Sequence, residues 1–382
     1  MSRLSRNLRA TSRRSRRPHV RVAVLGLALL GVFLASCGSG QPAASGLSSA
    51  RRPRKSAHHV PASPASTSAP STTSPPSAQT GGWGAPYSIG SPNVGGQGTV
   101  SCATSTFCVA ATSSSSNTYS YNGRSWSFWA NDQLNLSDTG SDGNLSLSCS
   151  STSLCAAGYG DSNAQVFDGQ SWSPPTPVDP NYPNGLYAVS CAGRSFCAAL
   201  GLVTASIYDG STWSAPQQID AHHVNGLSAL SCPTSRFCLA ADTAGEEMTY
   251  NGSTWSKPTK IISNALGIDA VSCASPTFCM AVSSHRAMRY NGASWSSPAP
   301  ISINAGFQLE SVSCPTSTFC MAVDNAGQAF MFNGSGWSGP VVIDPGAAPG
   351  EVFPSGATVS CPSASLCVAV SSVDAFVWRG VP

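Results

Sequence analysis

The stretch Val312-Ser-Cys-Pro-Thr-Ser-Thr-Phe-Cys-Met-Ala-Val323, followed by Phe332-Asn-Gly-Ser-Gly-Trp-Ser-Gly-Pro340, decides the fold of this chain. Seven close copies of it follow one another at intervals of 41 to 47 residues. The first cysteines of the copies are Cys102, Cys149, Cys191, Cys232, Cys273, Cys314 and Cys361. Self-similarity at this period is typical of propellers and solenoids, not of several unrelated domains.

Each copy predicts four short strands. The first ends in (Val/Leu)-Ser-Cys, the second begins (Phe/Leu)-Cys-x-Ala, the third ends in an aromatic residue, and the fourth opens with Trp-Ser-x-Pro. Six copies carry Asn-Gly or Asp-Gly between the third and fourth strands, and these dipeptides tolerate the positive φ of tight hairpin turns. No helical apolar period is sustained after residue 35, so we expect an all-β domain.

The prolines and the chain ends predict how the strands are arranged. Proline has no N–H to donate, so the fourth strand, which contains it, is expected at the outer edge of each sheet. The last copy stops after a third strand, Ala375-Phe-Val-Trp-Arg-Gly380, whereas Trp83-Gly-Ala-Pro86-Tyr-Ser-Ile89 precedes the first copy and resembles a fourth strand. We therefore predict a seven-bladed β-propeller over residues 82–382, closed by 83–89 pairing beside 374–380, and not an open solenoid.

The cysteine count agrees with seven units. Fifteen cysteines equal one near the N-terminus plus seven Cys-x5-Cys pairs. In an exported protein such pairs predict local disulfides, while zinc is the poorer alternative because no histidine accompanies each pair. The expected disulfides join Cys102 with Cys108, Cys149 with Cys155, Cys191 with Cys197, Cys232 with Cys238, Cys273 with Cys279, Cys314 with Cys320, and Cys361 with Cys367.

The N-terminal region predicts export. Residues 1–37 begin with a basic segment and continue with the apolar run Val22 to Leu34, which is too short to span a bilayer comfortably. The run ends in Leu34-Ala35-Ser36-Cys37, which resembles a bacterial lipobox, and the resemblance implies lipidation of Cys37. An ordinary secretory cleavage site or a short anchor is the alternative. Residues 38–81 are dominated by Ser, Ala, Pro, Thr and Gly, and we expect a disordered tether.

The charge distribution excludes one class of partner. Residues 82–382 contain 8 basic and 17 acidic residues, so this part carries 8 − 17 = −9, although the whole chain is formally +3. Nucleic-acid binding requires a basic face, which this domain lacks.

Function is expected where the copies differ, because the repeated Trp, Tyr and Cys serve the fold. Alternating strands would bring the loops between the second and third strands, together with the connections between blades, to one face of the disc. We name this the variable face; the cysteine turns and Asn-Gly turns form the constant face. The candidate binding residues on the variable face are Asp161, Asp242, Glu246, His285, Arg286 and Asp324. His222-His223 and insertions around 130–145 and 344–357 belong to the same face.

No catalytic, phosphate-binding or metal-binding motif is present, and we expect neither a cofactor nor a metal. Carboxylates from different blades, such as Asp161, Asp242 and Asp324, would support glycoside hydrolysis if they converged near the axis.

Two resemblances to families follow from the repeats. Asp209-Gly-Ser-Thr-Trp213 and Asn251-Gly-Ser-Thr-Trp255 resemble the Asp-box turn of sialidase-type propellers, although the Asp-box has one residue between its aspartate and glycine. As a whole, the chain resembles bacterial exported lipoproteins with seven Ser-Cys-x5-Cys propeller repeats, which generally have no assigned activity.

The sequence thus predicts a monomeric, lipid-anchored module on the extracytoplasmic face of the cell membrane. Its partner would be a protein or a glycan of the envelope. The alternative is a propeller-type glycan hydrolase or lyase, and converging carboxylates in a pocket on the variable face would favour it.

Overall fold

The computed structural model describes residues 81–89, 97–113, 117–129, 134, 144–181, 185–220, 226–262, 267–301, 307–343 and 356–380. All of them belong to one compact unit, 73–382. The predictions for Cys37, for the signal and tether segments up to residue 80, for His222-His223 and for most of the two insertions lie outside the described residues. Every regular element in the described part is a β-strand, and this part contains no helix that is long and apolar enough to cross a membrane.

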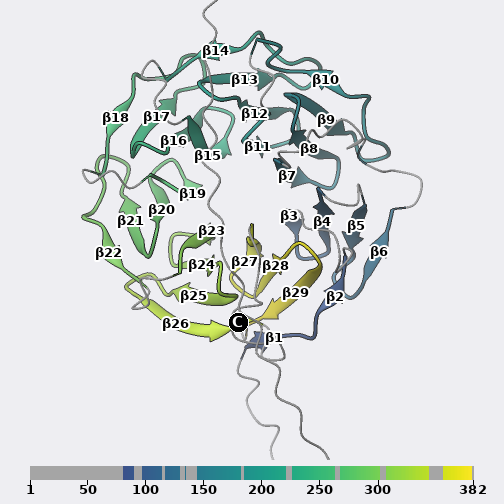
Figure 1. Ribbon diagram of the computed structural model, residues 1–382, viewed down its shortest axis with the longest axis vertical. Helices are drawn as coiled ribbons and strands as arrows, with labels where there is room; N and C mark the ends of the chain where they lie inside the picture. Colours follow the sequence, from purple (N-terminus) through teal and green to yellow (C-terminus); the bar gives the residue numbers. More distant parts are fainter. Residues whose placement is uncertain are drawn as a thin grey trace, which may run out of the picture. The chain divides into compact units, whose positions relative to one another are not determined.

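The strands form seven antiparallel sheets arranged in a ring, which is a seven-bladed β-propeller (Figure 1). Blade 1 consists of β3 (Gly98–Thr104), β4 (Phe107–Thr112), β5 (Thr118–Tyr121) and β6 (Trp126–Phe128). Blade 2 consists of β7 (Leu145–Ser151), β8 (Leu154–Tyr159), β9 (Asn163–Phe167) and β10 (Thr176–Pro177). Blade 3 consists of β11 (Ala188–Ala192), β12 (Phe196–Leu200), β13 (Thr204–Tyr208) and β14 (Gln217–Gln218).

The remaining blades repeat the pattern. Blade 4 consists of β15 (Leu227–Thr234), β16 (Phe237–Asp242), β17 (Glu246–Tyr250) and β18 (Thr259–Lys260). Blade 5 consists of β19 (Ala270–Ser275), β20 (Phe278–Ser283), β21 (Arg286–Tyr290) and β22 (Ala299–Pro300). Blade 6 consists of β23 (Leu309–Thr316), β24 (Phe319–Asp324), β25 (Gln328–Phe332) and β26 (Trp337–Val342). Blade 7 consists of β27 (Thr358–Ser363), β28 (Leu366–Val370) and β29 (Asp374–Arg379), with β1 (Gly82–Trp83) and β2 (Tyr87–Ser88) at its outer edge.

The predicted closure of the ring is confirmed. Trp83 pairs with Trp378 and Tyr87 pairs with Ala375, so the N-terminal segment supplies the outer strand of blade 7. The segment pairs as two short pieces, β1 and β2, separated by Gly84-Ala-Pro86. A hydrophobic cluster that includes Ile89, Val100 and Val368 fills the interface between blades 7 and 1.

The outer strands are shorter than the sequence predicts. In blades 2 to 5 the tryptophan that should open the fourth strand makes only an isolated bridge to the aromatic residue of the third strand, such as Tyr250 to Trp255. Regular pairing resumes only after the proline, for example at Thr259–Lys260. The missing proline N–H explains the interruption, because that position cannot donate to the ladder.

The Asn-Gly and Asp-Gly turns are held by their first residue. In each of these six turns the glycine, and not the Asn or Asp before it, has a positive φ, between 91° and 100°. The Asn or Asp side-chain oxygen accepts the backbone N–H groups two and three residues later, as Asp209 Oδ1 does from Ser211 and Thr212 at 2.8 Å. These two hydrogen bonds, together with one from the Ser211 hydroxyl, hold the pKa of Asp209 down at about 2.

Every predicted disulfide is present, and each one joins the first and second strands of its own blade. In order along the chain they are Cys102–Cys108, Cys149–Cys155, Cys191–Cys197, Cys232–Cys238, Cys273–Cys279, Cys314–Cys320 and Cys361–Cys367. The second cysteine of every pair is fully buried. Seven disulfides indicate that the domain folds in an oxidising compartment outside the cytoplasm.

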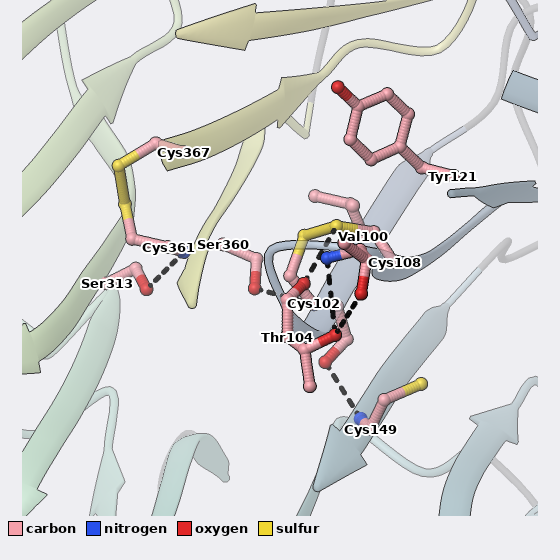
Figure 2. Close-up of a disulfide and its surroundings, with 12 residues drawn as sticks. Val100, Cys102, Thr104, Cys108, Tyr121, Cys149, Ser313, Ser360, Cys361 and Cys367 are labelled. Atoms are coloured by element: carbon pink, nitrogen blue, oxygen red, sulfur yellow. Dashed lines mark hydrogen bonds between the residues drawn. A yellow bond between two sulfur atoms is a disulfide. The ribbon is translucent and has the colours of Figure 1, made fainter. Parts of the chain in front are cut away.

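A closed belt of hydrogen bonds joins the blades at the level of these disulfides. The serine before each first cysteine accepts the backbone N–H of the first cysteine in the following blade, at 2.8 to 2.9 Å. Figure 2 shows three consecutive steps, from Ser313 to Cys361, from Ser360 to Cys102, and from blade 1 to Cys149. The serine of the repeated Ser-Cys therefore links its blade to the next one, a role that the sequence analysis does not predict.

Candidate functional site

The first strands of the blades surround the axis of the ring (Figure 1). They line a pocket of about 280 Å³, to which all seven blades contribute. We call it the central pocket. Its walls are formed by the residues two and three positions before each first cysteine. The residues two positions before are all aliphatic: Val100, Leu147, Val189, Leu230, Val271, Val312 and Val359. Because each first strand begins at a connection between blades, the central pocket lies on the side of the variable face.

The mouth of the central pocket is where the blades differ most. The residues four positions before the first cysteines are Gly98, Leu145, Tyr187, Ser228, Asp269, Glu310 and Ala357. Those of blades 2 to 6 line the pocket, whereas Gly98 and Ala357 do not. This one row carries two carboxylates, a phenol and a hydroxyl, whereas the polar residues elsewhere in the wall are the uncharged Gln97, Thr99, Ser146, Ser311 and Thr358.

Asp269 and Glu310 are the chemically notable pair at the mouth. They occupy the same position in the neighbouring blades 5 and 6. Asp269 is exposed at the mouth, but the protein atoms around the central pocket reduce its hydration and so raise the pKa of its carboxyl group. Loss of hydration also raises the pKa of Glu310, and the negative charges of Asp269 and Asp324 raise it further. Three carboxylates thus interact electrostatically on this side of the ring.

A strained residue fixes the geometry of this pair. Ser284, in the turn between β20 and β21, has a φ of 54°, which is uncommon for a residue other than glycine. Its N–H donates to Asp269 Oδ2 at 2.6 Å, and its carbonyl accepts the N–H of Leu309, the neighbour of Glu310, at 2.7 Å. The turn at Ser284 therefore contacts both sides of the pair: the side chain of Asp269 and the backbone next to Glu310. Ser162, in the corresponding loop of blade 2, also has a positive φ, of 63°, so this backbone conformation is not confined to the blade that carries Asp269.

The predicted binding residues Asp242 and Asp324 stabilise their own turns. Both end a second strand and are almost fully buried, at 2% and 1% exposure. Asp242 Oδ1 accepts the N–H groups of Ala244 and Glu246 at 3.0 and 2.7 Å, and Asp324 Oδ1 accepts those of Ala326 and Gln328 at 3.0 and 2.8 Å. Burial is the main reason that the pKa of each carboxylate is raised. Neither lines the central pocket.

The other predicted residues are spread over three blades. Asp161 is half-buried in the turn after β8, and its Oδ1 is buried with no hydrogen-bond partner in the described part of the chain. His285 Nδ1 lies 3.2 Å from the hydroxyl of Ser284, beside the strained turn. Arg286 begins β21 and is half-buried. His285 and Arg286 directly follow Ser284, whose N–H donates to Asp269.

Glu246 belongs to an acidic cluster at the junction of blades 3 and 4. Carboxylate oxygens of Asp220, Asp242 and Glu246 lie within 4.8 Å of one another, which is an oxygen set of the kind that a hard divalent cation prefers. Lys260 pairs with Glu246 across the sheet, and its Nζ donates to the carbonyl of Ala244 in the same turn. A positive charge of the chain itself therefore lies beside this cluster.

Comparison with known proteins adds the class of fold. No family model matches the chain, and no curated protein matches it. Among solved structures, one described as YCF48 bound to D1 peptide is 14% identical, with a TM-score of 0.54, and the match covers 78% of this chain and 95% of that one. YCF48 from Cyanidioschyzon merolae is 11% identical, with a TM-score of 0.55, over 78% of this chain and 98% of that one. At these identities the likeness shows the fold alone: the chain is a seven-bladed β-propeller with a disulfide in every blade.

Proposed function

We propose that this protein is an exported binding module that holds a protein partner on the variable face of its propeller. A positively charged side chain of the partner enters the central pocket and lies between Asp269 and Glu310. The observation that carries the proposal is this pair of carboxylates at the mouth of a pocket to which every blade contributes.

The charge of the site supports a cation as the inserted group. No Lys or Arg lines the central pocket in the described part of the chain, and residues 82–382 carry a formal charge of −9. A concave site lined by one sign of charge attracts the opposite sign and speeds association. A partly dehydrated carboxylate also gains more from a cationic partner than a fully hydrated one does.

Two further features support a protein partner at the envelope. One structure with the same fold is described as YCF48 bound to D1 peptide, so a propeller of this kind accepts a peptide ligand. The lipobox-like segment before Cys37 and the Ser/Pro-rich residues 38–81 would anchor the module and extend it from the membrane. On this proposal the protein is a lipid-anchored receptor on the extracytoplasmic side.

Site-specific photo-crosslinking in the producing cell tests the proposal. A photoreactive residue at Gln308, which is exposed beside the mouth of the pocket, should capture a partner protein. The same residue at Arg194, in the exposed cysteine turn of blade 3 on the constant face, is the matched control and should not. The adduct at position 308 should be lost in Asp269→Asn/Glu310→Gln. Equal capture from both faces, or an adduct that persists in the double variant, would refute the proposal.

A hydrolase or lyase acting on glycans is the second candidate, and the same carboxylate pair favours it. A general acid needs a raised pKa, and both Asp269 and Glu310 have one. Incubation of the protein with a panel of envelope glycans, followed by mass spectrometry of the products, tests this candidate. Glu310→Gln should abolish turnover, and the absence of any cleaved product with the unsubstituted protein rules the candidate out.

A further inference from the structure

A groove lies at the perimeter of the ring, where the N-terminal strands and blade 7 meet blade 1. It has a volume of about 530 Å³, within the range of about 300–1,000 Å³ that is usual for small-ligand sites. Its side chains with rings or charges are Trp83, Tyr87, Tyr121, Arg124, Trp126 and Arg379. We call it the closure groove, because the N-terminal strands form one wall and blade 1 forms the other.

Equivalent grooves occur between other blades and serve as an internal reference. The groove between blades 3 and 4 is lined by Gln217, Trp255 and Lys257, and the one between blades 5 and 6 by Arg289, Ile301 and Trp337. Each of them contains one tryptophan and one basic residue. The spacing of the blades therefore creates such grooves. The closure groove differs in having four aromatic side chains and two arginines, against one or two aromatic side chains and one basic residue in the others.

The two arginines make the closure groove positive in an acidic domain. Arg379 Nη2 donates to Tyr121 Oη at 2.5 Å and to the carbonyl of Gly123 at 2.7 Å, which fixes the guanidinium at one end of the groove. Arg124 is exposed near it. No carboxylate lines the groove, and neither arginine has a carboxylate partner among the described residues. These are two of only eight Lys and Arg in residues 82–382.

The rings provide an apolar surface beside this charge. Tyr87 is 40% exposed and stacks on Trp126 at 6.4 Å with an interplanar angle of 25°. Tyr119 and the 49% exposed Phe128 extend the aromatic surface, with ring centroids 5.5 Å apart. Tyr87 and Phe128, two of the four exposed large hydrophobic side chains in the described part of the chain, thus lie at the junction of blades 7 and 1. An exposed patch of rings with a charged border is characteristic of a binding site.

The floor of the groove is the face of β29, whose backbone pairs with β28 on one side and with β1 and β2 on the other, and the edge segment 82–87 forms one wall. Ala375, Val377 and Arg379 alternate along β29, so their side chains point to the same side of the sheet and form the floor. An extended peptide that adds to a sheet needs a row of unpaired backbone groups, which a sheet face does not offer. A sugar ring needs what is present: an aromatic face for its C–H groups and hydrogen-bond donors for its oxygens.

We propose that the closure groove binds an anionic glycan whose sugars carry carboxylates, with a sugar ring packed on the exposed Tyr87, which the buried Trp126 supports from behind, and a carboxylate held by Arg124 and Arg379. The exposed Arg124 can form the paired hydrogen bonds by which a guanidinium matches a carboxylate in shape. Nη2 of Arg379 already donates to Tyr121 and Gly123, so this arginine offers its Nη1 and Nε groups to the ligand. This site is separate from the central pocket and opposite to it in charge.

Isothermal titration of the full-length exported protein with a hexuronate tetrasaccharide tests the proposal. The tetrasaccharide should bind, and its carboxyl-reduced neutral counterpart should bind roughly tenfold more weakly or not at all. Arg124→Ala should weaken binding by about tenfold, because it removes a charged hydrogen-bond donor without touching the core. Tyr87→Ala should weaken it by roughly threefold or more through the lost stacking.

The matched control is Arg289→Ala, which removes an arginine from the groove between blades 5 and 6 and should leave the affinity unchanged. Thermal unfolding of each variant verifies that it is folded. A sulfated tetrasaccharide or a Tyr-containing poly-glutamate peptide that binds more tightly than the hexuronate would overturn the assignment of the ligand. No binding of the hexuronate, equal binding by Arg124→Ala, or self-association of the protein that Arg124→Ala abolishes would overturn the site.

Discussion

The hydroxyl of Ser360 accepts the backbone N–H of Cys102 at 2.9 Å, and this hydrogen bond is one of those that connect the last blade to the first. Six equivalent hydrogen bonds connect the other neighbouring blades. The contact at the chain ends is therefore of the same kind as the contacts inside the array.

Removal of the serine hydroxyl at the junction of blades 7 and 1 should cost as much stability as removal of the equivalent hydroxyl between two internal blades. Ser360→Ala and Ser231→Ala each leave a cysteine N–H without its acceptor, and each should lower the free energy of unfolding by about 1–3 kcal/mol. Urea unfolding followed by tryptophan fluorescence measures both, with the exposed Ser127→Ala as control. An unaffected Ser360→Ala variant, beside a destabilised Ser231→Ala variant, would mean that the ring is open in solution.

Each disulfide closes a loop with a sequence separation of 6 residues. Loop entropy then gives a stabilisation of about 2 kcal/mol per bridge, so the double substitution of Cys314→Ser with Cys320→Ser should lose roughly that amount. The loss should be independent of which blade is chosen, and Cys191→Ser with Cys197→Ser is the comparison in blade 3. Calorimetry of such pairs measures it, and mass spectrometry should find no free thiol in the unsubstituted domain.

The Asp-Gly turn of blade 3 should respond to pH with a definite sign. The folded-state pKa of Asp209 is lowered to about 2, from an ordinary 3.8, by backbone hydrogen bonds from Thr212 and Ser211 and by the Ser211 hydroxyl. Its stabilisation is therefore present above the unfolded pKa and is lost as pH falls from about 4 to about 2. Asp209→Asn keeps the acceptor but does not titrate, so the difference in urea midpoint between the two proteins should depend on pH only in this window.

Binding at the central pocket should weaken in mild acid. The pKa values of Asp269 and Glu310 are raised in the free protein, and a bound cation favours their charged forms. Affinity for a cationic ligand should therefore rise with pH through the range above the ordinary carboxylate pKa and then level off. Titrations between pH 4 and 8 show this, and an affinity that is flat over the range would argue against these two carboxylates as the ligands of the cation.

The fold was predictable from sequence because each repeated residue has one structural task. The Cys-x5-Cys spacing predicts a hairpin disulfide, Trp-Ser-x-Pro predicts an edge, and Trp83 to Ile89 supplies what the last copy lacks. The structure adds the task of the serine before the cysteine. That task involves the next blade, so no pattern inside a single copy reveals it.

The candidate site was less predictable, because loop polarity was a poor guide to exposure. Asp242 and Asp324 were expected to face a ligand, but their carboxylates accept backbone N–H groups of their own turns and are buried. Asp269 and Glu310 are not among the predicted residues because they do not lie in a variable loop: Asp269 directly precedes β19, and Glu310 is the second residue of β23. Alignment of the seven copies on their cysteines contains the signal: at the fourth position before the cysteine, Gly, Leu, Tyr, Ser, Asp, Glu and Ala replace one another.

The most direct test of the central pocket compares two peptides of the same shape. A pentapeptide Gly-Ser-Arg-Ser-Gly and its citrulline counterpart differ only in the charge of one side chain. We predict that the arginine peptide binds the full-length protein roughly tenfold more tightly, and that the difference disappears in Asp269→Asn/Glu310→Gln. Equal affinities of the two peptides for the unsubstituted protein, or a preference for arginine that survives in the double variant, would contradict a cation site at the axis of the propeller.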